Sequence, residues 1–228
     1  MTERVDRLVQ AVADGLLAPD VAERVTRWLT HSAYAAWSGK LNALVEKDDF
    51  GELTRLFWRE IPFGTGGRRG VMGPLGTATI NERTIAESAH GLAIYLQQAG
   101  HEHGRVVIAH DVRHRSPEFA RLAATTLAAH DLRVCLFDGF RATPTLSFAV
   151  RHLECAAGIV ISASHNPPSD NGFKAYWSHG GQVLPPHDEG IISGVTAAES
   201  IPELDYATAL ADGRIELLGP EIDEAYRE

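Results

Sequence analysis

Apolar side chains recur at helical spacing through the first sixty residues of the chain. One such series runs from Val5 to Val12, a second begins after Asp20, and a third covers residues 50–59. Positions three and four apart lie on the same face of a helix, so each series predicts a helix with one buried side. We therefore expect residues 1–60 to form an N-terminal helical extension.

After this segment, short β-branched runs alternate with amphipathic helical segments. The predicted strands are 105–109, 132–137, 157–161 and 173–177, and the predicted helices are 81–98, 117–129, 143–153 and 186–198. This alternation is typical of an α/β sheet whose faces are covered by helices. Beyond residue 201 the pattern is less regular, with a strand expected at 214–218 and a helix that begins at Pro220 and is interrupted by the end of the sequence.

The strand predicted around residues 158–161 leads into a polar loop. Its run is apolar and continuous, the pattern of a strand buried on both faces, and Pro167 prevents it from continuing. Ligands bind beyond the carboxyl ends of strands in open α/β sheets. Ser164 is therefore expected in a crevice beside His165, with Lys174 returning to the same edge on the next strand.

Composition narrows the class of protein. The chain has 228 residues, of which 44% are hydrophobic, enough to bury a full core in one domain. The formal net charge of −9 argues against a nucleic-acid surface and against attraction to anionic lipid. No apolar run is long enough to span a bilayer and the N-terminus lacks the core of a signal peptide, so we expect a cytoplasmic protein. Cys135 and Cys155 stand singly in apolar surroundings and are expected to be buried, reduced thiols.

The polar loop and the strand after it carry a recognisable motif. Residues 162–167 are Ser-Ala-Ser-His-Asn-Pro and residues 171–174 are Asn-Gly-Phe-Lys. Together they resemble the active-serine loop of the α-D-phosphohexomutases, the phosphoglucomutase and phosphomannomutase family. The usual form begins with threonine, so Ser162 is the one departure in the core motif, and it keeps the hydroxyl. The resemblance implies that Ser164 carries a phosphoryl group and exchanges it with a sugar phosphate.

A glycine-rich stretch, Phe-Gly-Thr-Gly-Gly-Arg-Arg-Gly, occupies residues 63–70. Glycines let backbone N–H groups approach a phosphate closely, and the guanidinium fork of arginine binds phosphate oxygens in bidentate fashion. A glycine-rich hairpin with two solvated arginines is the plain alternative. The stretch resembles the family's Phe-Gly-Thr-x-Gly-x-Arg-Gly, which implies that Arg69 faces the phosphoserine while Arg68 fills a variable position. We predict phosphate binding by Thr65, Arg68 and Arg69.

Two further segments resemble the family more weakly. Residues 110–116, His-Asp-Val-Arg-His-Arg-Ser, are similar to its Asp-x-Arg-x-x-Ser and add Arg113 to the predicted phosphate-binding residues. Asn166 of the serine loop belongs to the same predicted set. Ser116 is expected to cap the following helix. Residues 141–145 resemble a Thr-Pro loop, with Pro144 expected at the first helical position.

The resemblance implies a reaction cycle and a cofactor. Phosphorylated Ser164 gives its phosphoryl group to a hydroxyl of a hexose monophosphate, and the sugar bisphosphate that results returns its other phosphate to the serine. Mg²⁺ would bind an oxygen of the phosphate on Ser164. Lys174 and His165 are the candidates for general acid and base, and Arg69 would stabilise the transferring group. The expected partners are a sugar phosphate and a sugar bisphosphate.

The resemblance covers the first of the family's four domains. We expect an α/β fold, a three-layer α/β/α sandwich with a mixed sheet preceded by the helical extension. The predicted boundaries are 1–60 for the extension, 61–200 for the phosphoserine domain, and 201–228 for a linker or the start of a truncated second domain. The family's Asp-Gly-Asp-x-Asp-Arg metal loop and its sugar and C-terminal phosphate loops are absent. We therefore expect the chain to be inactive alone and to need the missing domains of the same enzyme.

Two other functions stay open at this point. One is a stand-alone phosphosugar-binding or regulatory module, and the other is a serine hydrolase with Ser164 as nucleophile. Adjacent residues of an extended loop point to different sides, which places His165 poorly as a base, and no Gly-x-Ser-x-Gly elbow is present. The serine loop could also be a polar turn that caps the strand. The sugar is not identified, although the long helical N-terminus resembles the phosphoglucomutase and phosphopentomutase branch.

Overall fold

The computed structural model describes residues 2–64 and 66–228. The chain divides into two compact units. The first comprises the residues up to 61 together with 72–81, and the second comprises 62–71 and 82–228.

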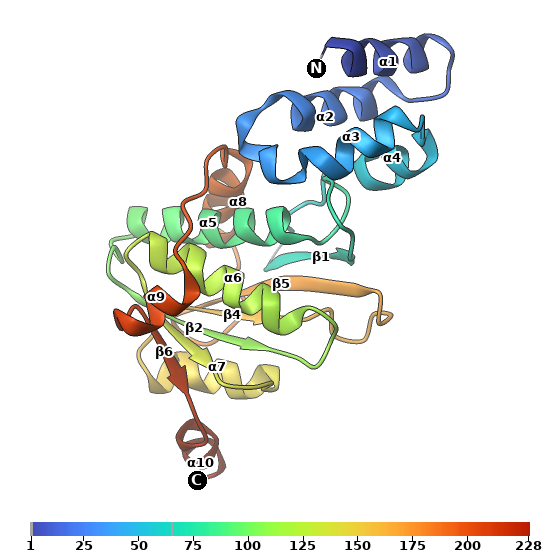
Figure 1. Ribbon diagram of the computed structural model, residues 1–228. Coiled ribbons are helices and arrows are strands. Elements are labelled where there is room, and N and C mark those ends of the chain that lie inside the picture. The colour runs from blue at the N-terminus through green and yellow to red at the C-terminus, as the bar shows by residue number, and fades with distance from the viewer. Residues whose placement is uncertain (1, 65) are drawn as a thin grey trace. The chain divides into compact units, whose positions relative to one another are not determined.

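The first unit is helical, as expected for the N-terminal extension. It contains α1 (Thr2–Ala13), α2 (Pro19–Thr30), a 3₁₀ turn (Ser32–Trp37), α3 (Ser38–Glu46) and α4 (Phe50–Phe57), drawn in blue to cyan in Figure 1. Its core is aromatic at the centre, because Trp28 stacks on Tyr34 with ring centroids 4.5 Å apart and meets the edge of Phe57 at 5.4 Å. Leu75, outside these helices, is fully buried in the same core.

The second unit is built on a mixed six-stranded sheet in the order β1-β5-β4-β2-β3-β6. Its strands are β1 (Gly67–Val71), β2 (Arg105–His110), β3 (Arg133–Phe137), β4 (Ala157–Ile161), β5 (Asp170–Trp177) and β6 (Ile215–Leu218). The strands β4, β2, β3 and β6 are parallel, whereas β5 runs antiparallel to both β4 and β1. The carboxyl ends of β2, β3 and β4 therefore meet at one edge of the sheet.

Helices cover both faces of this sheet. The helices α5 (Glu82–Gln98) and α6 (Ser116–Ala129) lie on one face and α7 (Thr143–His152) on the other (Figure 1). The helix α8 (His187–Thr196) packs on α5, α9 (Tyr206–Ala211) on α6, and α10 (Glu221–Arg227) on α7. The expected three-layer α/β/α sandwich with a mixed sheet is confirmed. None of the helices within residues 2–64 and 66–228 is both long and apolar enough to cross a bilayer.

Two glycines allow the close approaches that shape the sheet. A Cβ on Gly158 of β4 would lie 2.5 Å from Cγ2 of Val150, so α7 can lie directly on the strand that leads to the serine loop. Gly67 begins β1 with φ +147°, and a Cβ there would lie 1.9 Å from the carbonyl oxygen of Phe173. Only glycine lets β1 pair so closely with β5 at that point.

The two cysteines are both buried, as expected. Cys135 lies on β3, and Cys155 precedes β4. A hydrogen bond to Cys135, together with burial, raises the pKa of the Cys155 thiol. The Cys155 thiol therefore stays protonated and unreactive at neutral pH.

Candidate functional site

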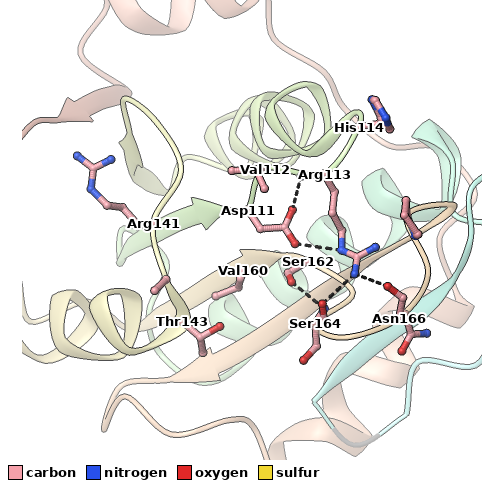
Figure 2. Close-up of a pocket in the computed structure, with 12 residues that line it drawn as sticks. Asp111, Val112, Arg113, His114, Arg141, Thr143, Val160, Ser162, Ser164 and Asn166 are labelled. Atoms are coloured by element: carbon pink, nitrogen blue, oxygen red, sulfur yellow. Dashed lines mark hydrogen bonds and ion pairs between the residues drawn. The ribbon is translucent and has the colours of Figure 1, made fainter.

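A pocket of about 530 Å³ opens at the edge where the parallel strands end (Figure 2). Three loops and the end of β4 line it, with residues Asp111, Val112, Arg113, His114, Arg141, Ala142, Thr143, Val160, Ser162, Ser164, Asn166 and Pro168. The first loop follows β2, the second follows β3 and the third follows β4. The predicted crevice beyond the strand ends is therefore present, and Ser164 lines it.

Ser164 occupies an unusual backbone conformation at the rim of this pocket. Its φ is 58°, in the left-handed region that few residues other than glycine adopt. The backbone N–H of Ser164 donates to the Oγ of Ser162 at 2.9 Å, and its carbonyl oxygen accepts a hydrogen bond from Arg113 at 2.8 Å. The side chain is exposed, so the turn presents the hydroxyl to the pocket and to solvent.

The side chain of Arg113 reaches from the loop after β2 into residues 162–170, the serine loop (Figure 2). Its Nη2 donates to the carbonyl oxygens of Ser164 and Asn166, at 2.8 and 2.7 Å. Its Nη1 donates to the carbonyl oxygens of Pro167 and Asp170, at 2.6 and 3.0 Å. The guanidinium is thus surrounded by the backbone of residues 164–170. The sequence-based assignment of Arg113 to phosphate binding stays a prediction.

A polar network that extends from half-buried Asp111 to buried Ser116 and Asn171 supports Arg113. Asp111 Oδ1 accepts hydrogen bonds from the Arg113 backbone N–H at 2.9 Å and from Ser116 Oγ at 2.7 Å. Its Oδ2 forms an ion pair with Arg113 Nε at 3.3 Å. Asn171 Nδ2 donates to Ser116 Oγ at 3.0 Å, which joins the start of α6 to β5. Ser116 is therefore the first helical residue, bonded to Asp111, and not the N-cap that the sequence suggested; Arg115 holds that position.

Two cations share the sheet face that leads into the pocket. Lys174 of β5 lies opposite Val160 of β4 and Gly67 of β1. Paired residues share a face, as do residues two apart on one strand, so Lys174 and Arg69 lie on the face of Val160, which lines the pocket. Burial and the positive charge of Arg69 lower the pKa of Lys174. A lowered pKa makes the ammonium a readier proton donor.

Arg68 points to the opposite face of the sheet. Its Nη1 donates to the Thr84 carbonyl oxygen at 3.1 Å and to Glu87 Oε2 at 2.8 Å, both on α5. Arg83 Nε donates to the other oxygen of Glu87 at 2.8 Å. Arg68 Nε is buried without a hydrogen-bond partner among the described residues. The structure therefore places Arg68 on the sheet face opposite to Arg69. Arg69 and Lys174 share the face of Val160 but are not themselves among the residues that line the pocket.

The remaining predicted site residues divide into three cases. His165 is exposed next to Ser164 in the sequence, and no hydrogen bond joins its ring to the described residues. Asn166 Nδ2 donates to Asp170 Oδ2 at 2.8 Å, which braces the serine loop internally. Thr65 lies outside the described residues. Asp111, Ser116 and Asn171 were missed as supporting residues, although the Asp-x-Arg-x-x-Ser and Asn-Gly-Phe-Lys motifs contain them.

The described residues do not form a site for a divalent cation by themselves. No group of three or more His, Cys, Asp and Glu side chains within residues 2–64 and 66–228 could hold a metal ion. The carboxylate that lines the pocket, Asp111, has both oxygens engaged by Arg113 and Ser116. The predicted Mg²⁺ contact through a phosphate on Ser164 therefore stays a prediction, and no chemical step is routed through it.

Comparison with known proteins places this geometry in context. Residues 60–202 match the family described as phosphoglucomutase/phosphomannomutase, alpha/beta/alpha domain I. A Homo sapiens phosphopentomutase is 36% identical over 181 residues, 76% of this chain and 29% of that protein. A Staphylococcus epidermidis phosphoglucomutase is 43% identical over 152 residues, 64% of this chain and 28% of that protein. A Thermus thermophilus crystal structure assigned as a phosphomannomutase superposes with TM-score 0.61 and 34% identity, covering 71% of this chain and 34% of the other.

Proposed function

The chain belongs to the phosphoglucomutase/phosphomannomutase family, and from that premise we propose that it is the phosphoserine-bearing first domain of a phosphohexomutase. The complete reaction interconverts sugar 1-phosphates with 6-phosphates, or with 5-phosphates for pentoses. The observation that carries the proposal is the position of Ser164. Its exposed hydroxyl stands on a braced turn at the pocket rim, where three parallel strands end.

The proposed chemistry is phosphoryl exchange between Ser164 and a sugar hydroxyl. The bond between Ser164 Oγ and phosphorus breaks as a sugar hydroxyl oxygen bonds to the same phosphorus. The proton of that hydroxyl passes to a nearby base, and the serine oxygen takes up a proton as it leaves. The reverse step returns the other phosphate of the bisphosphate to Ser164. Because little covalent assistance is needed, the protein contributes mainly position and positive charge.

Arg69 and Lys174 are the proposed sources of that charge. Both lie on the sheet face of Val160, which lines the pocket, and neither side chain forms a hydrogen bond with another described residue, so their donors are available to phosphate oxygens. Lys174, with its lowered pKa, is the proposed proton donor, and His165 beside the serine is the proposed base. Thr65, of the glycine-rich stretch, and Asn166, which follows His165, are also proposed to bind phosphate.

Turnover is proposed for a longer chain than this one. The matched region spans 29% of the human phosphopentomutase and 28% of the staphylococcal phosphoglucomutase. We propose that sugar recognition and metal binding use segments that these relatives carry beyond the matched region. The chain described here would then supply the phosphoryl carrier and its cations.

The direct test is the phosphorylation state of Ser164. The chain is purified together with the segments that its relatives carry beyond the matched region and is incubated with a hexose 1,6-bisphosphate and Mg²⁺, and intact-protein and tandem mass spectrometry locate any added phosphoryl group. We expect one group on Ser164 and none on Ser164→Ala. Ser169→Ala is the matched control, because Ser169 is exposed in the same loop and bonds only Asp170 there. It should be labelled like the natural chain.

Two outcomes would contradict the proposal. One is a chain that never carries phosphate on Ser164, either as purified or after incubation. The other is labelling that persists in Ser164→Ala. Binding of the bisphosphate without any transfer would favour the phosphosugar-binding module instead. A fluorophosphonate that modifies Ser164 would favour the hydrolase, although no described imidazole is hydrogen-bonded to its hydroxyl.

A further inference from the structure

We infer that Arg113 is a positioning residue, which holds the serine loop in the turn that presents Ser164 and does not itself bind the phosphoryl group. This inference rests on the proposed function of Ser164 and replaces the phosphate-binding role predicted from the sequence. The reason is that the hydrogen-bonding capacity of Arg113 is already filled by its own protein.

An arginine side chain has five N–H donors in a fixed plane and no acceptor. The four N–H groups of its two terminal nitrogens are all used by carbonyl oxygens of the serine loop, at 2.6 to 3.0 Å. The fifth, on Nε, faces Asp111 Oδ2 at 3.3 Å. A phosphate could bind Arg113 only by displacing loop carbonyls, and that would release the turn on which Ser164 stands.

The loop needs such a cation because its carbonyl groups converge. The carbonyl oxygens of Ser164, Asn166, Pro167 and Asp170 all point at one guanidinium whose side chain is only 12% exposed. Without it, their partial negative charges would face one another in a half-buried space. The planar fork of arginine can reach two carbonyls with each terminal nitrogen, whereas the single nitrogen of lysine cannot.

Asp111 fixes Arg113 in turn. It bonds the Arg113 backbone and faces its Nε, and it also accepts from Ser116, which is linked to Asn171 of β5. The position of Ser164 is therefore tied through Arg113 to the carboxyl end of β2 and to β5. This connection also explains why the motifs around residues 111–116 and 171–174 accompany the serine loop.

The first test is amide hydrogen exchange across residues 162–170. In Arg113→Lys we expect exchange there to be faster by about tenfold or more, because charged hydrogen bonds to the loop are lost. Arg141→Lys is the matched control. Arg141 lines the same pocket and is similarly buried, but its guanidinium binds Asp138, Asp223 and its neighbour's carbonyl. Exchange in the serine loop should be unchanged in Arg141→Lys.

The second test measures orthophosphate binding and chemical rescue. Arg113→Ala should accept a phosphoryl group from a hexose 1,6-bisphosphate more slowly, and added guanidinium ion should restore the rate where ammonium ion does not. Three results would overturn the inference. The first is unchanged exchange of the serine loop in Arg113→Lys, and the second is exchange in that variant that is uniformly faster throughout the sheet unit. The third is weaker orthophosphate binding by an Arg113 variant whose serine loop is still protected from exchange. The last would make Arg113 a direct phosphate ligand.

These readouts separate the inference from the proposed function. Loop exchange and orthophosphate binding do not require Ser164 to be phosphorylated. If the natural chain never accepts a phosphoryl group, the carrier role of Ser164 is wrong while the exchange data still decide the role of Arg113. If Ser164 is phosphorylated and Arg113→Lys leaves the loop protected, only the positioning role is wrong.

Discussion

The left-handed conformation of Ser164 has an energetic cost and a structural support. For a residue with a side chain, this conformation costs about 1–2 kcal/mol relative to the right-handed one. The hydroxyl of Ser162 offsets part of that cost by accepting the Ser164 N–H at 2.9 Å. Ser162, where the family usually has threonine, therefore keeps the hydroxyl oxygen that accepts this hydrogen bond.

Substitutions at Ser162 should distinguish the hydroxyl from the rest of the side chain. Ser162→Ala leaves the Ser164 N–H without its acceptor, and we expect the loop to lose about 1 kcal/mol of local stability. Ser162→Thr keeps the hydroxyl and should match the natural chain. Exchange of the Ser164 amide, followed by NMR, measures the difference. Equal protection in the alanine and threonine variants would mean that the hydroxyl does not hold the turn.

The pattern of residues located the serine, but it could not settle the roles of the arginines. Arg68 and Arg69 are adjacent, so a strand must send them to opposite faces. Which of them shares the sheet face of Lys174 depends on the pairing of Gly67 with Lys174, more than a hundred residues away in the chain. The role of Arg113 depends in the same way on carbonyl groups of a loop that begins at residue 162. Neither relation has a local signal.

At the scale of elements, α5 and α6 meet through a pair of histidines. His90 Nδ1 and His130 Nε2 lie 2.9 Å apart, a distance that requires one ring to donate and the other to accept. Burial lowers the pKa of both rings, with Arg83 contributing at His90 and His90 contributing at His130. The contact therefore favours neutral imidazoles, while Glu87 and Asp131 act in the opposite direction.

This pair makes the stability of the sheet unit depend on pH. The unfolded chain binds protons at these histidines near the usual pKa of 6.5, whereas the folded chain binds them only at lower pH. Below about pH 6.5 the unfolded state holds more protons, so the free energy of unfolding falls as the pH decreases. Urea unfolding from about pH 8 to about pH 5 measures this slope. In His130→Gln, which cannot titrate, the slope should be shallower; an unchanged slope would assign the effect to other groups.

The predicted helices and strands of the sheet unit were placed within a few residues, and two elements were missed. The helix expected at 81–98 is Glu82–Gln98, and the strand expected at 157–161 is Ala157–Ile161. Long amphipathic segments and continuous β-branched runs give these elements a strong local signal. In contrast, β1 contains two glycines and two arginines and lies in the glycine-rich stretch, where no strand was predicted, and α9 has only six residues. Pairing with β5 and packing on α6 stabilise them, and neither contact has a local sequence pattern.

At the scale of the whole chain, the two compact units interleave along the sequence. The predicted boundary at residue 60 stays a prediction, but residues 72–81 group with the N-terminal helices after the chain has already formed β1. The Ala78 N–H donates to the Leu56 carbonyl at 2.9 Å, and Thr77 Oγ1 donates to the Arg59 carbonyl at 2.7 Å. This return segment inserts Leu75 into the helical core. The pattern of apolar and polar residues around positions 72–81 does not predict that this segment packs with the N-terminal helices.

Leu75 tests whether the helical unit depends on the return segment. Leu75 is fully buried among α1–α4 core residues, so Leu75→Ala should cost about 2–5 kcal/mol through the lost contacts and the cavity left behind. Since the units form separate cores, we expect hydrogen exchange to rise across residues 2–61 and to stay low across 82–228. Leu146→Ala, an equally buried position in the α7 cluster, is the matched control and should give the reverse pattern. If either variant instead raises exchange equally in both segments, the prediction is wrong and the two units unfold as one. Removal of one buried side chain raises exchange in both cores only when they unfold cooperatively.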